Sequence, residues 1–269
     1  MLRSHLLRDS AVYHRLKASL LYDMYWRVRD PRIIDERDSE VTFYRRLLDG
    51  MPRQALVFDV GANHGYKVDI FLRLGARVVA IDPDETNQAV LHDRFHALRW
   101  RERPVTIVGK AVSSECGFTS FWVDEPGGAK NTLSQKWVYA LQHDLARFGT
   151  ALSFAEERKV ETVTLADLFV AHGSPYFVKI DVEGHELGVL RGMDRPVPFL
   201  SFEVNLPDFL EEGIECIRRL RELRAASRFN FAGPEIGEGL LLPEWVEAVS
   251  MIEALGATRW HSVEIFCRT

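Results

Sequence analysis

Residues 57–83 read VFDVGANHGYKVDIFLRLGARVVAIDP, and this stretch decides the fold. Two short apolar runs, at residues 56–60 and 77–82, flank a glycine turn and a segment with helical spacing. A strand, a turn, a helix and a second strand in this order are typical of a parallel α/β sheet. Asp59 lies near the end of the first run and Asp82 ends the second. Because buried strands seldom end in unpaired carboxylates, both acids are predicted to serve a ligand.

The same alternation continues along the chain, with one interruption. Further strands are predicted at residues 105–112, 176–182, 198–205, 229–233 and 263–268, and helices at 184–193 and 213–226. Residues 161–169 resemble a strand leading into a short helix. Two segments lie between the strand predicted at residues 105–112 and residues 161–169. Residues 115–133 predict a β-hairpin or an extended excursion with a glycine-rich loop at Gly127 and Gly128, and residues 134–158 favour helix or loop.

The N-terminal 50 residues have a different pattern. Tyr13, Leu16, Leu20 and Leu21 recur at helical spacing, and Pro31 separates two amphipathic segments. A pair of helices packed on the core is preferred over a lid, a dimer contact or a membrane-surface element. We therefore predict an N-terminal helical extension at residues 1–50 and one α/β domain at residues 51–269.

Composition limits the class of protein. The chain has 269 residues, 46% of them hydrophobic, and a net charge of −5, which argues against nucleic-acid binding by bulk charge. Cys116, Cys216 and Cys267 are far apart and form no CxxC pair, so neither a disulfide framework nor a zinc site is expected. No secretory signal and no run long enough to span a membrane is found. A cytoplasmic protein is predicted, and a homo-oligomer is left open.

The glycine turn GANHG predicts a ligand site. In open parallel sheets, ligands bind outside the carboxyl ends of the strands, where glycine allows the backbone to approach them. A nicotinamide or flavin site would require GxGxxG, but Asn63 stands where the middle glycine would be, and no Walker lysine follows. Asp59 would repel a pyrophosphate and attract a cationic amino-acid group, and Asp82 could accept hydrogen bonds from ribose hydroxyls. The combination suggests S-adenosylmethionine, with an ordinary tight turn as the alternative.

A second polar cluster lies in residues 178–192, VKIDVEGHELGVLRG. A buried strand is followed there by Asp181, Glu183 and His185 around Gly184. This strand is expected to adjoin the first one across the switch point of the sheet, so that its end faces the same crevice. Acids and a histidine in that place could orient a hydroxyl, deprotonate it or stabilise a sulfonium.

Taken together, these motifs resemble a known family. The sequence contains in this order VFDVGANHG, AIDP, KNTL, VKIDVEGHELGVLRGM and SFEVN. From about residue 55 onwards the chain resembles the FkbM-type methyltransferases. The resemblance implies a Rossmann-like class I methyltransferase fold with a mostly parallel seven-stranded sheet, helices on both faces, and S-adenosylmethionine as the cofactor. It also implies an acceptor that is a hydroxyl of a sugar, a polyketide or a related small molecule.

The resemblance further implies roles for single residues in the cofactor site. The methionine and ribose portion would be lined by Gly61, Ala62, Asn63 and Gly65. Asp59 would lie beneath them and Asp82 would bind the ribose hydroxyls. Ala111 would lie near the adenine, and Asp181 near the transferred methyl group.

The catalytic chemistry leaves alternatives open. A general base should help to deprotonate a weakly acidic hydroxyl, and Asp181, His185 and Glu183 are the candidates. A divalent metal held by Asp181, Glu203 and Asn205 is a second route, to which we do not commit. An oxidoreductase with a nicotinamide cofactor and a non-catalytic protein of the same fold are the alternative functions.

Overall fold

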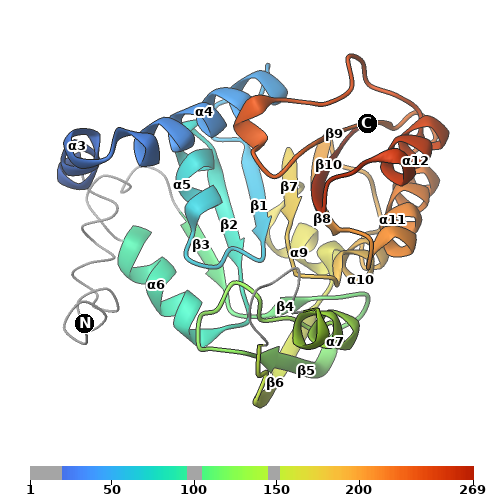
Figure 1. Cartoon of the computed structure of the whole chain (residues 1–269), viewed down its shortest axis with the longest axis horizontal. Helices are drawn as coiled ribbons and strands as arrows, with labels where there is room; N and C mark the ends of the chain where they lie inside the picture. The colour runs from blue at the N-terminus through green and yellow to red at the C-terminus, as the bar shows by residue number, and fades with distance from the viewer. Residues whose placement is uncertain (1–19, 96–104, 145–151) are drawn as a thin grey trace.

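A seven-stranded sheet forms the centre of the computed structural model, which describes residues 20–95, 105–144 and 152–269 (Figure 1). Its strand order is β3-β2-β1-β7-β8-β10-β9. Only β10 runs antiparallel to its neighbours, β8 and β9, so the predicted mostly parallel seven-stranded sheet is confirmed. The strands are β1 (Leu56–Val60), β2 (Arg77–Ile81), β3 (Val105–Val108), β7 (Phe177–Ile180), β8 (Phe199–Asn205), β9 (Arg228–Ala232) and β10 (Ser262–Arg268).

Helices cover both faces of this sheet, as predicted. One face packs against α4 (Pro31–Leu47), α5 (Tyr66–Arg73) and α6 (Glu85–Phe95), and the other against α9 (Leu165–His172), α10 (Glu186–Arg191), α11 (Leu210–Leu223) and α12 (Ala248–Ala257). Side chains alternate along each strand, so Val57 faces the first layer and Phe58 the second. Asp59 therefore points to the same face as Val57, beneath α4 and α5.

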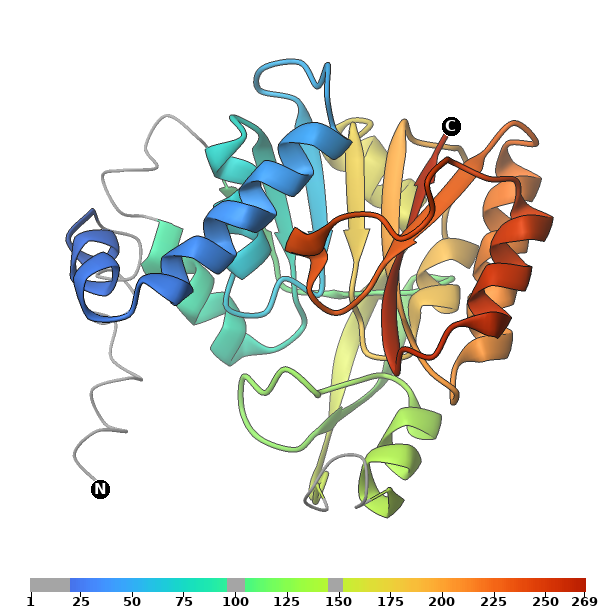
Figure 2. The same ribbon diagram turned by 45° about the horizontal axis from the view of Figure 1, so that its top comes forward.

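The N-terminal part contains two helices on either side of Pro31, as the sequence predicts. The first, α3, spans Leu20–Arg29, and α4 begins at Pro31. Figure 2 shows α4 lying across the sheet, beside the loop that contains the short 3-10 helix η2 (Ile236–Glu238). The ring of Tyr44 on α4 is fully buried and packs edge-on against Phe71, with 5.2 Å between ring centroids. The division at residue 50 stays a prediction, and Tyr13 and Leu16 lie outside the described residues.

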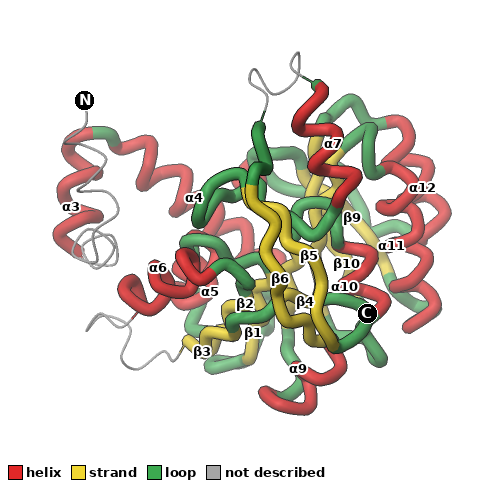
Figure 3. The backbone as a smooth tube through the Cα atoms, turned by 90° about the horizontal axis from the view of Figure 1, so that it is seen from below, coloured by secondary structure: helices red, strands yellow, loops and turns green. Residues whose placement is uncertain are grey.

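A separate three-stranded sheet interrupts the main alternation. It has the order β4-β6-β5, with β4 at Ala111–Val112, β5 at Gly117–Val123 and β6 at Glu156–Val163. Figure 3 shows this sheet from below, with α7 (Gln135–His143) beside it. We call residues 111–163 the insertion. Its strand β5 pairs along its length with β6. The hairpin expected within residues 115–133 is reduced to a single bridge, between Trp122 and Thr132.

The prediction of one strand over residues 105–112 is wrong. The main sheet takes β3, whereas β4 pairs with β6 of the insertion. The break falls at Gly109, which packs so closely against α6 that a methyl group there would lie 2.5 Å from the side-chain oxygen of Gln88. Residues 156–158, expected to be helix or loop, belong to β6.

The cysteines and the helices bear on the expectations that the chain has no disulfide framework and no membrane span. All three cysteines are free, with Cys216 and Cys267 buried and Cys116 exposed. None of the helices within the described residues has the length and apolarity needed to cross a bilayer.

Candidate active site

The glycine turn between β1 and α5 packs directly against the end of β7. Gly61 has a φ of 84° and Gly65 a φ of 74°, which favour glycine. The backbone N–H groups of Gly61 and Ala62 donate hydrogen bonds to the carbonyl oxygen of Ile81, at 2.9 and 3.1 Å. A Cβ atom at Gly61 would lie 1.7 Å from the carbonyl oxygen of Asp181. Gly61 therefore lets the carboxyl ends of three neighbouring strands meet.

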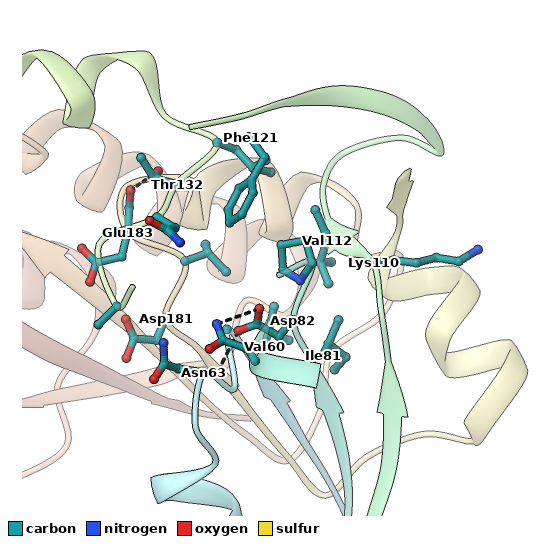
Figure 4. Close-up of a pocket in the computed structure, with 18 of the residues that line it drawn as sticks. Val60, Asn63, Ile81, Asp82, Lys110, Val112, Phe121, Thr132, Asp181 and Glu183 are labelled. Carbon is teal, nitrogen blue, oxygen red and sulfur yellow. Dashed lines mark hydrogen bonds between the residues drawn. The ribbon is translucent and has the colours of Figure 1, made fainter. Parts of the chain in front are cut away.

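Asp82 fastens this turn to the end of β2. One carboxylate oxygen accepts a hydrogen bond from the backbone N–H of Asn63, at 2.8 Å (Figure 4). The other accepts from the backbone N–H of Asp84 at 2.9 Å and from the side-chain amide of Asn87 at 3.1 Å. Burial raises the pKa of Asp82 to about 6, although these donors act to lower it. The carboxylate is thus a structural part of the turn as well as a candidate ligand group.

Asp59 lies beneath the turn, away from the cavity described below. Its side chain is 1% exposed, and neither carboxylate oxygen has a hydrogen-bond partner among the described residues. Burial raises the pKa of Asp59 to about 6, while the nearby ammonium of Lys179 acts to lower it. Lys179 itself, 3% exposed in the middle of β7, forms an ion pair with Asp181 at 2.7 Å. A buried charged layer therefore supports the turn from below.

A cavity of about 60 Å³ lies at the carboxyl ends of β1, β2 and β7. Six of the residues predicted for the site line it: Gly61, Asn63, Asp82, Ala111, Asp181 and Glu183. The other predicted residues, Asp59, Ala62, Gly65 and His185, lie outside its lining. A larger hollow of about 780 Å³ lies between α4 and the loop after β9, at the amino end of β8. Since ligands of such sheets bind at the carboxyl ends, the smaller cavity is the candidate site.

A loop of the insertion covers this cavity. The backbone N–H of Gly127 and the side-chain amide of Asn131 each donate to Asp84, both at 3.0 Å. The side-chain amide of Asn63 donates to the carbonyl oxygen of Gly127 at 3.3 Å. On the other side of the cavity, the hydroxyl of Thr132 donates to the carbonyl oxygen of Glu183 at 2.6 Å (Figure 4). Residues 127–132 thus connect the end of the cavity at the glycine turn to its acidic end.

Three carboxylates gather at the acidic end. Oxygen atoms of Asp181, Glu183 and Glu203 lie within 4.8 Å of one another. Each carboxylate has a donor of its own, since Lys179 pairs with Asp181, Trp137 donates to Glu183 at 2.7 Å, and Ser262 donates to Glu203 at 2.5 Å.

These carboxylates differ in pKa for physical reasons. Burial and, second, the charge of Asp181 raise the pKa of Glu183 to about 8. Burial and the charge of Asp181 also raise the pKa of Glu203 well above its ordinary range. Burial acts to raise the pKa of Asp181, but the ammonium of Lys179, together with a hydrogen bond with Glu203 and the charge of Lys67, outweighs burial and lowers this pKa. Glu183 and Glu203 therefore hold protons at pH values where Asp181 is ionised.

His185 stands apart from this group. It occupies the position just before α10, and its Nε2 atom lies 3.0 Å from the hydroxyl of Ser113. Burial lowers its pKa. The structure therefore separates His185 from the two carboxylates with which the sequence groups it.

Several contacts of the site are not identified from the sequence. Trp137 and Thr132 contact Glu183 from the insertion, and Phe121 and Val112 line the cavity near Ala111. Thr132 belongs to the quoted motif KNTL, which was the available signal for this residue. Lys110 also lines the cavity, but its ammonium points away from the other residues in Figure 4 and pairs with Glu161 at 2.5 Å.

Glu186 makes the stability of the fold depend on pH. It is 6% exposed, accepts hydrogen bonds from the backbone N–H groups of Val182 and Gly184, and burial raises its pKa to about 8. The folded state then binds a proton that the unfolded chain releases near pH 4.5. This stabilisation is full below that pH and is lost as the pH rises through about 8.

We predict that Glu186→Gln flattens this pH dependence. Between pH 5 and 8.5 the wild type should lose roughly 4 kcal/mol more unfolding free energy than the variant. Chemical denaturation at several pH values measures the difference. Glu222→Gln, at a side chain that is 68% exposed, is the control and should follow the wild type. Parallel curves for wild type and Glu186→Gln would contradict the assignment.

Comparison with known proteins adds a family match. Residues 59–225 match the family model described as the methyltransferase FkbM domain. No curated protein sequence matches the chain.

Remote likenesses to solved structures accompany this match. The precorrin-6y C5,15-methyltransferase of Geobacter metallireducens is 10% identical, with 87% of this chain and 88% of that chain covered and a TM-score of 0.41. A putative RNA methyltransferase of Pyrococcus horikoshii is 10% identical, with 86% and 81% covered and a TM-score of 0.40. The plantazolicin methyltransferase BpumL, solved with SAH, is 10% identical, with 100% and 99% covered and a TM-score of 0.36. At these scores the likenesses carry no functional weight, and the family match stands without them.

Proposed function

The chain belongs to the FkbM family of S-adenosylmethionine-dependent methyltransferases, and from this we propose that it methylates a hydroxyl oxygen of a sugar, a polyketide or another small molecule. The observation that carries the proposal is the cavity that joins the glycine turn, Asp82 and the carboxylates of Asp181 and Glu183. The turn suits a nucleoside with an amino-acid tail, and the carboxylates suit the acceptor.

The proposed position of the cofactor follows the cavity from one end to the other. Gly61 and Asn63 would contact the methionine portion, Asp82 the ribose, and Ala111 the adenine. Ala62 and Gly65 would shape the turn without lining the cavity, because Gly65 packs against Leu91 and Phe95. Asp59 would act from beneath through the charged layer with Lys179.

Entry of the cofactor requires the covering loop to move. Pockets that hold ligands of this size measure roughly 300–1,000 Å³, whereas the cavity here measures about 60 Å³. Residues 127–132 would have to release Asp84 or Glu183 to make room. This loop is held mainly by side-chain contacts, so its displacement leaves the main sheet intact.

We propose Glu183 as the general base, ahead of Asp181 and His185. The cofactor supplies a methyl group on a sulfonium, so the protein has to position the acceptor hydroxyl and take up its proton. A base works best when its pKa lies near the working pH, and Glu183, at about 8, meets this condition. Asp181 is the weaker base because Lys179 holds its pKa low. His185 lies beside Ser113, outside the cavity lining.

The proposed reaction does not require a metal ion. Three carboxylates this close together could suit an oxygen-liganded cation such as Mg²⁺. However, Lys179 already neutralises Asp181, and Trp137 and Ser262 already donate to the other two. We therefore assign the three acids to the acceptor side of the reaction.

Asn87 gives a prediction about the cofactor. Of the described residues that line the cavity, it alone has a buried side-chain atom without a hydrogen-bond partner, its Oδ1. The side chain is 2% exposed and its amide donates to Asp82. A ribose hydroxyl is the donor that would satisfy Oδ1 there.

We predict that Asn87→Ala weakens S-adenosylhomocysteine binding about 5- to 10-fold, as expected for one lost hydrogen bond. Titration with analogues that lack the 2′- or the 3′-hydroxyl tests the partner. One of these analogues should bind the wild type more weakly than the parent compound does. The variant should bind that analogue and the parent compound equally well. If removing the hydroxyl weakened binding equally in the wild type and the variant, the proposed hydrogen bond between the ribose and Asn87 would be contradicted.

The oxygen specificity is tested by transfer from S-adenosylmethionine with a ¹³C-labelled methyl group. A panel of glycosides and hydroxylated polyketides serves as acceptors, and the chemical shift of the product methyl carbon identifies the atom methylated. An O-methyl product supports the proposal. Transfer only to carbon or nitrogen contradicts the oxygen specificity, and cofactor binding without transfer to any acceptor favours a non-catalytic protein.

A further inference from the structure

One side chain of the insertion reaches the carboxylate that we propose as the base. Trp137 on α7 is 2% exposed, and its Nε1–H donates to an oxygen of Glu183 at 2.7 Å. The indole ring packs edge-on against Phe209, with 5.6 Å between ring centroids. Packing fixes the ring, and the indole can only donate, so the position of the bound carboxylate oxygen is fixed too.

The backbone of Glu183 is held by the same segment. Glu183 has a φ of 55°, a conformation that is uncommon for a residue with a side chain. Its carbonyl oxygen accepts the hydrogen bond from Thr132. Thr132 in turn accepts from the backbone N–H of Ser134, and the side chain of Ser134 caps α7 by accepting from the backbone N–H of Trp137. Residues 132–137 thus hold both the main chain and the carboxyl group of Glu183.

Acidic side chains surround Glu183, and they bear on the hydrogen bond that Trp137 donates to it. Asp181, Glu203 and Glu186 all lie close enough to Glu183 to act on its charge, and Lys130 is the nearby cation that opposes them. Of these acids, Asp181 is the one that is ionised, because Glu203 and Glu186 hold protons. An ionised Glu183 is therefore repelled by Asp181, and its carboxylate would swing away from Asp181 if it were free. The indole hydrogen bond is the direct contact that resists this movement, since Lys179 pairs with Asp181.

We propose that Trp137 is a positioning residue, which holds the carboxyl group of Glu183 beside Asp181 at the place where acceptor and cofactor meet. The inference rests on the proposed function. It makes the insertion, and not the main sheet alone, responsible for the geometry of methyl transfer. A purely structural Trp137 would contribute only the volume of its ring, which a phenylalanine largely retains.

The test compares Trp137→Phe with the wild type in titrations with S-adenosylmethionine and with S-adenosylhomocysteine. The first ligand carries the positive sulfonium and the second does not, so their affinity ratio reports a nearby carboxylate. The variant should bind S-adenosylmethionine about fivefold more weakly, while S-adenosylhomocysteine binding changes less than about twofold. Trp260→Phe, at a side chain that is 46% exposed, is the matched control and should leave the ratio unchanged.

A spectroscopic measurement keeps the test decisive if the variant folds poorly. The chain has six tryptophans, and indole ¹⁵N–¹H spectra resolve their side chains individually. Glu183→Gln should shift the resonance of Trp137, whereas Glu222→Gln should not. An unchanged affinity ratio in a folded Trp137→Phe protein, or an unmoved Trp137 resonance in Glu183→Gln, overturns the inference. Failure of the wild type to bind S-adenosylhomocysteine would instead contradict the proposed function.

Discussion

Replacing Gly61 by alanine is expected to abolish cofactor binding and to destabilise the fold. The new methyl group would lie 1.7 Å from the carbonyl oxygen of Asp181, a backbone atom that cannot turn aside. Either the glycine turn or the end of β7 must move, and both line the cavity. We expect affinity for S-adenosylhomocysteine to fall more than about 100-fold and unfolding free energy to fall by roughly 3 kcal/mol or more. Calorimetric titration and chemical denaturation measure the two effects.

Gly75 provides the matched control for this substitution. Its φ of 88° resembles the 84° of Gly61, but no atom lies within 4 Å of the position that a Cβ would take. Gly75→Ala therefore adds only the backbone strain, about 1 kcal/mol, and should leave cofactor affinity unchanged. Similar affinities for the two variants would contradict the close approach of the turn to β7.

The second large effect is expected for Asp82→Ala. The sequence alone would attribute to this residue one ligand contact. In the structure its carboxylate also accepts from Asn63, Asp84 and Asn87, so its loss leaves three protein donors without their acceptor at a position only 5% exposed. We expect S-adenosylhomocysteine affinity to fall about 100-fold, together with a loss of stability on the order of 3 kcal/mol.

The control for Asp82→Ala is Asp194→Ala, which removes the same charge from a side chain that is 51% exposed. It should change neither affinity nor stability measurably. Asp82→Asn retains one acceptor but directs an amide group at a donor, so an intermediate affinity is expected. Wild-type affinity in a folded Asp82→Ala protein would remove Asp82 from the site.

The main sheet could be predicted because its signals are local. The run at residues 56–60, the glycine turn and the run at residues 77–82 each follow from hydrophobic period and turn chemistry. The pairing of β7 with β1 followed from the rule for switch points. The split of residues 105–112 could not be predicted, because an apolar run does not indicate whether it pairs with the main sheet or with the three-stranded sheet of the insertion. Only Gly109 marked the break.

The candidate site was predictable where its residues lie at strand ends. Asp82, Asp181 and Glu183 line one cavity because their strands end at the same edge of the sheet. The contact of Trp137 with Glu183 could not be predicted, because it spans 46 residues of sequence and depends on how α7 packs. Lys179 could have been noticed, since a lysine in the middle of a buried strand requires a charged partner. Its pairing with Asp181 is what moves our proposed base to Glu183.

The most direct test of the central claim is calorimetric titration of the whole protein with S-adenosylhomocysteine, with NADH titrated alongside. The account predicts micromolar binding of S-adenosylhomocysteine and no binding of NADH. Absence of S-adenosylhomocysteine binding, or a preference for NADH, would contradict the assignment of the cavity and with it the roles proposed for Gly61, Asp82 and Glu183.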